Sequence, residues 1–416
     1  MTAWASAEPH RSTRTLESLA FAAGVLIVLI FSQAWAFPLL GENIDPSSGG
    51  LIRLMFLPAY ACALFLLALQ PMPFLLAMVR QPLLLLLMAV VGVSMLWSVE
   101  PDQTVRRMVA LYATTLGGVV LGVRYSWPRL AEVIGTAFAI LAVGSLVMAV
   151  AFPSIGVMHV LFPGAWRGLW EEKNALGGIM ALGVCALSAA ALLNPARARV
   201  WWPLAGLALG LILMSTSKTS LVALVLGTGV MAFVWLVRRG PAMSVAATWL
   251  AVLAIGAAAC LAIFASDVLF GLLGKDATLT GRTRIWAAVI HQIKLRPWTG
   301  YGYGAVWTEE GNWGPLAWII KEAGFKPGHA HNSWLEQWLG LGVFGLGAFA
   351  LFYLQTLVTA IIGAFRTAGA YFFAPYLIVY TLISLTESVA VTYNDFRWVI
   401  FVAIAVRLAL PREDLA

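Results

Sequence analysis

Apolar stretches recur along almost the whole chain, and they constrain its fold more than any other feature of the sequence. Of the 416 residues, 61% are hydrophobic and only 11% are charged, whereas about a quarter are charged in an ordinary soluble protein. A water-soluble core cannot bury this much apolar surface, but a lipid bilayer accommodates it. The composition therefore predicts an all-α, polytopic membrane protein.

A helix that crosses a bilayer needs roughly 20 predominantly apolar residues. The sequence predicts about twelve such helices, and an even number leaves both termini on the same side of the membrane. Their expected positions are residues 19–39, 51–70, 82–97, 108–123, 131–152, 175–193, 201–214, 219–237, 243–265, 333–356, 370–388 and 396–410.

Basic residues in alternate short loops predict the orientation. With a cytoplasmic N-terminus, the loops holding Arg80, Arg124, Arg238 and Arg366 are also cytoplasmic, as the positive-inside rule expects; Arg106–Arg107 is the main exception. The net charge of +7 thus reflects topology and predicts no nucleic-acid partner. The expected organisation is a cytoplasmic tail over 1–18, helices over 19–265, a large external loop over 266–332, helices over 333–410 and a cytoplasmic tail over 411–416.

The external loop over 266–332 concentrates charges, five tryptophans and three of the five histidines. Loops of this length in compact proteins are usually functional. Within it, one stripe of a helix expected over 282–294 holds the apolar residues Ile285, Trp286, Val289, Ile290 and Ile293. Its periodicity predicts an amphipathic helix at the outer membrane surface, which the turn after Pro297 would end.

Three further polar clusters are expected on the same side of the membrane. One is the Ser215–Ser220 hairpin with Lys218, where a membrane-embedded cation either has a role or snorkels to water. Another runs from Trp166 to Asn174 and holds Arg167 and Lys173, which contact substrate or anchor the chain at the interface. The last contains Glu387, Asn394, Asp395 and Arg397, where we expect a structural charge pair.

The pattern His329-Ala330-His331-Asn332 offers two chemical interpretations. A zinc site needs three or four ligands, and the sequence shows no second His or Cys cluster, so no metal is expected. Alternatively, an imidazole at the mouth of a helix acts as a base, with Lys218, Arg282 and Arg284 on the same face as an anion clamp. A base beside a diphosphate clamp fits group transfer from a lipid-linked diphosphate.

Four segments in order carry a resemblance to a known family. The run His331–Gly345 resembles the signature of the O-antigen ligase/polymerase superfamily, a His-Asn followed by a helix that ends in LGxxG. Trp166–Gly177, Ser217–Ser220 and Leu279–Gly302 resemble further segments of its exopolysaccharide-polymerase branch. The resemblance covers roughly residues 160 to 400.

The resemblance implies a metal-independent, inverting glycosyltransferase without cofactors on the periplasmic face of the bacterial inner membrane. Its substrate would be an undecaprenyl-diphosphate-linked oligosaccharide, and its pathway partners a flippase and a chain-length regulator. The family's essential histidine corresponds to His331 and its diphosphate-binding residues to Lys218 and Arg282. Lys218 departs from the ligase pattern, which has arginine there, and a lysine offers a point charge instead of a planar fork.

Two alternatives remain at this stage. In the ligase branch the acceptor would be lipid A-core, and the sequence does not identify the sugar or the linkage. Twelve helices also suit a secondary transporter, although those usually show two matching halves and a midplane site, which this sequence lacks.

Among the neighbours of His331, we expect Arg284 to bind an anion or headgroups, His329 to contact substrate or orient the loop, and Asn332 to cap the helix at 333 rather than contact substrate.

Overall fold

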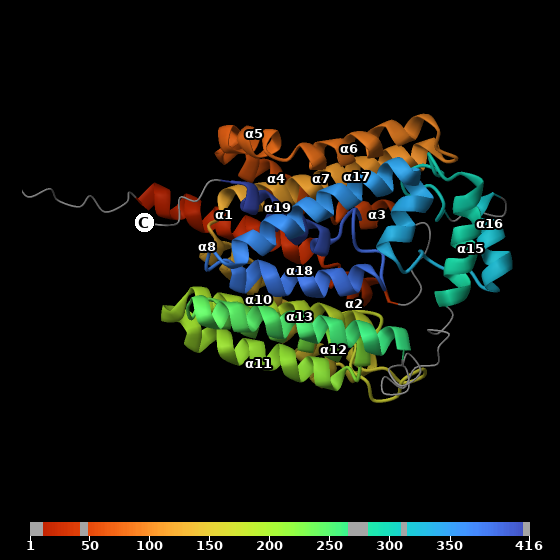
Figure 1. Cartoon of the computed structure of the whole chain (residues 1–416). Coiled ribbons are helices and arrows are strands. Elements are labelled where there is room, and N and C mark those ends of the chain that lie inside the picture. The colour runs from red at the N-terminus through yellow and green to blue at the C-terminus, as the bar shows by residue number, and fades with distance from the viewer. Residues whose placement is uncertain (1–10, 42–48, 265–281, 309–313, 411–416) are drawn as a thin grey trace, which may run out of the picture.

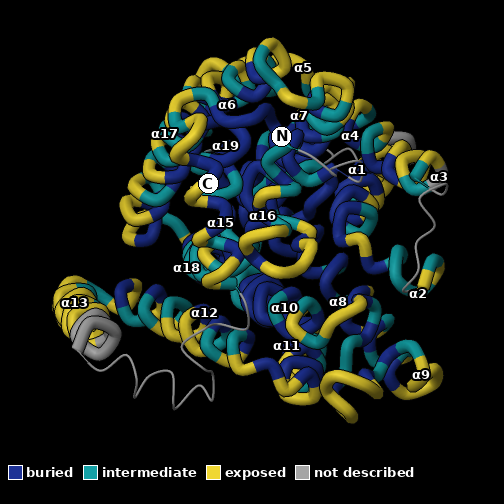
Figure 2. Tube along the Cα trace, turned by 90° about the vertical axis from the view of Figure 1, so that its right-hand side faces the viewer, coloured by how far each residue is buried: buried dark blue, intermediate teal, exposed yellow. Residues whose placement is uncertain are grey.

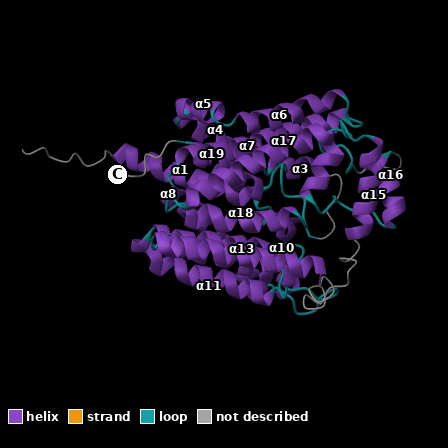
Figure 3. Cartoon of the chain, in the orientation of Figure 1, coloured by secondary structure: helices purple, strands orange, loops and turns teal. Residues whose placement is uncertain are grey.

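The computed structural model describes residues 11–41, 49–264, 282–308 and 314–410, and Figures 1 and 3 show that these form a bundle of long helices. Residues 1–10 of the predicted tail over 1–18, the predicted tail over 411–416, and residues 266–281 and 309–313 of the external loop lie outside the described residues. The α-helices are α1 (Arg11–Phe31), α2 (Ala36–Leu40), α3 (Gly49–Leu54), α4 (Leu57–Leu69), α5 (Pro71–Val79), α6 (Pro82–Val93), α7 (Pro101–Arg124), α8 (Trp127–Ala151), α9 (Pro153–Gly156), α10 (Lys173–Leu193), α11 (Ala198–Met214), α12 (Lys218–Val237), α13 (Pro241–Phe264), α15 (Arg282–Leu295), α16 (Pro315–Ala323), α17 (Ser333–Ala364), α18 (Ala370–Ser384) and α19 (Phe396–Ala409).

The all-α membrane class is confirmed, but the count of about twelve membrane helices is not. Among the described residues, seven helices are long and apolar enough to cross a bilayer, and the bent pair α5–α6 raises the number to eight. Every predicted range contains a helix, yet several helices are too short or too broken to qualify. Proline begins both α5 and α6, and the two are bent by 87° at the break between them. Proline lacks the backbone N–H that would continue a helix through such positions.

Helix α10 lies deep in the bundle, because 83% of its membrane-spanning length is buried within the protein. It packs against α8, α11, α12 and α18. Small residues let neighbouring helices approach closely, as is usual between helices in membranes. On α7, a Cβ at Gly118 would lie 2.6 Å from the carbonyl oxygen of Val399, and one at Gly122 would lie 2.5 Å from that of Ala403. These glycines allow the largely buried α19 to pack closely against α7.

The external segment forms a helical layer across one end of the bundle (Figures 1 and 2). The predicted helix over 282–294 is confirmed as α15, and α16 is an additional helix that packs on it. Three residues of its apolar stripe, Ile285, Val289 and Ile293, are buried in a separate apolar cluster that includes Leu316 and Ile319 of α16, whereas Ile290 of the same stripe is 39% exposed. Packing on α16 thus explains much of the amphipathic pattern, and a position at the membrane surface stays a prediction.

A break in α17 attaches this layer to the bundle. Gly342 has φ +65°, which interrupts the helix. The carbonyl oxygens of Leu339 and Gly340 accept hydrogen bonds from the N–H groups of Tyr301 (3.0 Å) and Gly302 (2.8 Å). Gly340 and Gly342 thus leave room for the loop over 297–304, which lies against the positions where a Cβ would be.

We expect Gly342→Ala to destabilise the protein strongly. A left-handed conformation costs an L-residue about 1–2 kcal/mol, and the new Cβ would lie 2.1 Å from the carbonyl oxygen of Trp298. The thermal unfolding midpoint in detergent should fall by several degrees. Gly347→Ala in the same helix is the control, because nothing lies within 4 Å of its Cβ position and alanine favours helix there. Equal midpoints for the two variants would refute this account of the break.

Candidate functional site

The predicted base is held by a carboxylate that also binds the predicted arginine. Glu387, which follows α18, accepts a hydrogen bond on Oε2 from Nδ1 of His331 at 2.9 Å, and its Oε1 forms an ion pair with Nη2 of Arg282. The three side chains are 20% to 31% exposed, so they are reachable from solvent while partly desolvated. His331 therefore presents its other ring nitrogen, Nε2, as the acceptor when the imidazole is neutral.

The loop that carries His331 is fixed by the start of α17. Oδ1 of Asn332 accepts hydrogen bonds from the N–H groups of Trp334 (2.9 Å) and Leu335 (3.1 Å), which confirms its predicted role as the N-cap. Its Nδ2 donates to the carbonyl oxygen of Leu385 at 3.2 Å. The Asn332 side chain is thus already engaged at both ends, and a direct contact with substrate is not needed to explain it.

A second carboxylate ties three segments together beneath this loop. Glu336 of α17 accepts hydrogen bonds from the N–H of Ala330 (2.9 Å), the hydroxyl of Ser388 (3.0 Å) and Nε1 of Trp307. A carboxylate with three donors is a strong local constraint. Glu336 therefore fixes the histidine loop relative to both the external layer and the segment after α18.

Arg107, the predicted exception to the orientation rule, has a structural reason to lie at this end. Its Nη1 donates to the carbonyl oxygen of Gly304, and its Nη2 donates to that of Trp307 at 3.0 Å. The guanidinium thereby satisfies two loop carbonyls in the fork geometry that suits arginine. It fastens the external loop to α7.

The remaining predicted cations form a separate group at α10 and α12. Nζ of Lys173 contacts Oγ1 of Thr216 at 3.2 Å, next to Lys218, and the two like charges are near enough to interact. No contact in the described part of the chain joins Lys218 to Arg282 directly. Arg284 is exposed on α15, and Nε of Arg167 donates to the carbonyl oxygen of Ile155 at 2.7 Å.

Helix register nonetheless brings both groups to the same end of the bundle. Helices α12 and α18 pack side by side, with Gly227 against Val379 and Arg238 over the ring of Tyr371. Residue numbers that fall on one helix while they rise on the other mean an antiparallel pair. The first residue of α12, Lys218, therefore lies at the end of α18 from which Glu387 emerges.

Backbone strain is concentrated at this end. Among the described residues, five other than glycine have positive φ, namely Gln33, Thr216, His331, Val391 and Asn394. This conformation is unfavourable for side chains with a Cβ and is common at functional sites. His331 has φ +50°, and Val391, which is β-branched, has φ +53°. This clustering of strained residues indicates a functional site at this end of the bundle, independently of the sequence motifs.

His329 stands beside the base as a neutral imidazole. Its ring centroid lies 3.9 Å from that of His331, and its Nδ1 accepts the backbone N–H of His331 at 3.1 Å. Burial, followed by the neighbouring His331, lowers the pKa of His329 from 6.5 to about 4. The side chain thus orients the loop without adding charge at neutral pH.

This pKa predicts that acid destabilises the folded protein. Below pH 6.5, His329 binds a proton in the unfolded chain but stays neutral in the folded protein. The free energy of unfolding therefore falls with falling pH until His329 of the folded protein is also protonated, near pH 4. The loss amounts to at most about 3 kcal/mol. Thermal unfolding at pH 7.5 and pH 5 should show a smaller drop for His329→Gln than for the unaltered protein. His159→Gln, at an exposed histidine, should keep the full drop, and an unchanged drop in His329→Gln would contradict the assignment.

His329, His331 and Glu387 together have the spacing of metal ligands, because their ligand atoms all lie within 4.8 Å of one another. The sequence argument against a metal overlooked Glu387 as a third ligand. Two of these groups are, however, engaged with protein partners through the same atoms, Nδ1 of His331 with Glu387 and Nδ1 of His329 with a backbone N–H. A metal at these atoms would have to displace those bonds.

The fourth predicted polar cluster separates into two parts. Asp395 caps α19 and pairs with Arg397, as expected of a structural charge pair. Glu387 belongs instead with His331 and Arg282. Nearby Arg282 and the hydrogen bond from His331 lower the pKa of Glu387 despite the opposing effect of burial, which keeps the carboxylate ionised. In the sequence, the one indication of a role for Glu387 was that a carboxylate lies at the predicted outer end of a membrane helix.

Two comparisons show which known proteins parts of this chain are similar to. Residues 203–350 match the family model described as O-antigen ligase. The exopolysaccharide production protein ExoQ of Rhizobium meliloti (strain 1021) is 30% identical over 210 residues, which are 48% of this chain and 46% of ExoQ. The chain thus matches about half the length of that curated relative. The predicted resemblance is confirmed to this extent: residues 203–350, which carry Lys218, Arg282 and His331, match the O-antigen ligase family model, and the curated relative is an exopolysaccharide production protein.

Proposed function

We propose that this protein is a membrane glycosyltransferase that polymerises undecaprenyl-diphosphate-linked oligosaccharide repeats in exopolysaccharide synthesis. The observation that carries the proposal is the chain of contacts from His331 through Glu387 to Arg282. The imidazole that would act as the base and the guanidinium that would bind the anion contact opposite oxygens of one carboxylate. The match to the O-antigen ligase family model and the name of the relative support polysaccharide chemistry.

In the proposed reaction, Nε2 of His331 takes the proton from a hydroxyl of the acceptor sugar. The oxygen attacks the anomeric carbon of the donor, and the bond from that carbon to the lipid diphosphate breaks with its electron pair on the departing phosphate. Such a one-step displacement inverts the anomeric configuration. Glu387 holds the proton on Nδ1, so that Nε2 carries the lone pair, and it stabilises the imidazolium that forms.

The departing diphosphate would be stabilised by Arg282 and Lys218. A guanidinium has five N–H donors, and only Nη2 of Arg282 is committed to Glu387, so others remain for phosphate. Lys218 begins α12, whose N-cap Ser217 makes no capping hydrogen bond through its side chain. The positive end of that helix's dipole adds to the attraction for an anion. Lys173 and Arg284 would provide secondary contacts with the donor, and Arg167 one with its sugar.

We further propose that the site faces the periplasm of the bacterial inner membrane, with both termini cytoplasmic. The lipid-linked repeat then arrives from a flippase, and a chain-length regulator of the same pathway acts on the product. Transfer onto lipid A-core, as in a ligase, is the alternative acceptor. The relative's printed function in exopolysaccharide production favours the polymerase.

Deleting the gene tests the proposal directly. A polymerase predicts that single repeats accumulate on the lipid carrier while long polymer disappears, and restoring the gene should restore the polymer. Normal polymer in the deletion strain would overturn the proposal. Repeats that fail to reach lipid A-core, with polymer still made on the carrier, would indicate the ligase instead.

Chelation with EDTA in membrane vesicles should leave the rate of polymer formation unchanged if the reaction needs no metal. A loss of rate that Zn²⁺ restores would favour a metal bound by His329, His331 and Glu387.

A further inference from the structure

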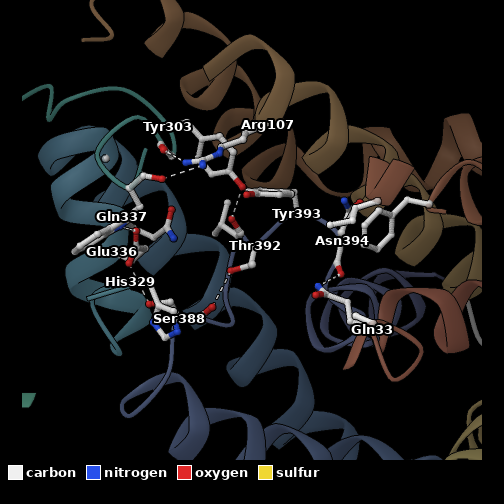
Figure 4. A pocket seen from close by; sticks show the side chains of 18 of the residues that line it. Gln33, Arg107, Tyr303, His329, Glu336, Gln337, Ser388, Thr392, Tyr393 and Asn394 are labelled. Carbon is white, nitrogen blue, oxygen red and sulfur yellow. Dashed lines mark hydrogen bonds between the residues drawn. The ribbon is translucent and has the colours of Figure 1, made fainter. Parts of the chain in front are cut away.

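A cavity of about 410 Å³ lies beside the histidine loop, within the size range of small-molecule sites. Figure 4 shows the polar side chains that converge on it from α7, α17 and the segment between α18 and α19. One part of its wall is aromatic, with Trp35, Phe56, Trp307 and Tyr393. Another part carries uncharged polar groups, among them Gln337, Ser388 and Thr392.

The lining holds one arginine and one glutamate, Arg107 and Glu336, whose opposite charges interact. Arg107 donates to the carbonyl oxygens of Gly304 and Trp307, and Glu336 accepts three hydrogen bonds. Neither Arg282 nor Lys218 is among the lining residues. A diphosphate would therefore find little to offset its charge here. Aromatic faces with hydroxyl and amide groups suit the apolar faces and hydroxyls of an uncharged sugar.

The cavity is built from strained backbone. Gln33, Val391 and Asn394 line it, and their φ values are +54°, +53° and +56°. Nε2 of Gln33 donates to the carbonyl oxygen of Asn394 at 2.9 Å, and the Tyr60 hydroxyl donates to Oδ1 of Asn394 at 2.5 Å. Strained residues that the surroundings hold in place are typical of ligand sites.

The cavity also adjoins the proposed base. His329 lines it, and the His329 ring lies 3.9 Å from that of His331. In the proposed reaction the base takes its proton from the acceptor, while the donor diphosphate lies with Arg282. We infer that this cavity is the acceptor-sugar subsite, which holds the sugar whose hydroxyl His331 deprotonates. The inference rests on the proposed function, because a protein has an acceptor sugar only if it catalyses a glycosyl transfer.

Two cavity variants test the inference. Thr392→Val removes a hydroxyl while keeping the shape, and Tyr393→Leu removes a ring. The probe is the free oligosaccharide repeat, released by mild acid from the lipid-linked intermediate of the producing cells. Its binding to the purified full chain is followed by saturation-transfer NMR. Each variant should weaken binding about tenfold, which is the loss of one good contact. Trp318→Ala, at an aromatic residue exposed on α16, should bind like the unaltered protein.

A second variant separates this inference from the proposed function. His331→Ala should lose transfer but still bind the oligosaccharide, because His331 does not line the cavity. In vesicles supplied with free oligosaccharide as the acceptor, Thr392→Val should raise the KM for that oligosaccharide about tenfold and leave the KM for the lipid-linked donor unchanged. Unaltered binding in both cavity variants would overturn the subsite. A rise confined to the KM for the lipid-linked donor would also overturn it. So would a loss of oligosaccharide binding when undecaprenyl phosphate alone is added. Continued transfer by His331→Ala would overturn the proposed function instead.

Discussion

Replacing His331 with alanine should reduce the rate of polymer formation by about 10²–10⁴-fold, the usual contribution of a positioned general base. The hydroxyl of a sugar is a poor nucleophile until its proton is removed. His331 is the imidazole at this site with Nδ1 held by a carboxylate, which leaves Nε2 for that proton. The rate is best measured as polymer made from the lipid-linked donor in membrane vesicles, at equal amounts of protein.

A matched histidine provides the control. Nδ1 of His291 on α15 also contacts a carboxylate, Oε1 of Glu322 on α16 at 2.6 Å, but its side chain is 55% exposed and away from the loop. His291→Ala removes the same chemical group with the same kind of partner, and its polymer formation should stay near that of the unaltered protein. If His331→Ala made polymer at the normal rate, the site would need a different base. Equal losses in both variants would indicate a structural effect rather than catalysis.

The helices were predictable because apolar composition is a local property, but the number of membrane crossings was not. Whether a predicted range is one span depends on breaks that packing determines. The chain is bent by 87° between α5 and α6, and α17 is interrupted at Gly342, where a loop from the external layer binds. The apolar stripe of α15 likewise looked the same in the sequence whether lipid or α16 would cover it.

The site was predictable as far as its short motifs reach. Asn332 follows His331 directly and begins α17, so its capping role could be read from residue type and position. Glu387 is 56 residues from His331, and nothing in a single sequence joins them. Proximity along the chain instead grouped Glu387 with Asp395 and Arg397, which form their own pair. Long-range pairing depends on how α18 packs beside the start of α17, and only the structure shows that.

Glu387→Gln should be nearly as damaging as the loss of His331, with a decrease between about 10² and 10⁴-fold. Glu387 accepts on both oxygens, from Nδ1 of His331 and from Nη2 of Arg282. Glutamine has the same shape but only one acceptor oxygen, and its NH₂ group must face one of the two donors. Whichever way the amide turns, one of the two contacts is lost, so either the base or the diphosphate clamp is misplaced.

The split between kcat and KM distinguishes this positioning role from a merely structural one. If Glu387 holds the imidazole for proton transfer and Arg282 for the diphosphate, its loss should lower kcat in the protein that remains folded, whereas a general loss of folded protein would lower the rate only in proportion to the folded amount. Burial acts to raise the pKa of Glu387, but the hydrogen bond from His331 and the charge of Arg282 keep it below the ordinary value of 4.5, so the carboxylate is ionised at neutral pH. Glu322→Gln, which alters the matching pair with His291, should leave kcat per folded protein unchanged. A Glu387→Gln variant with a normal kcat would show that His331 does not depend on this carboxylate.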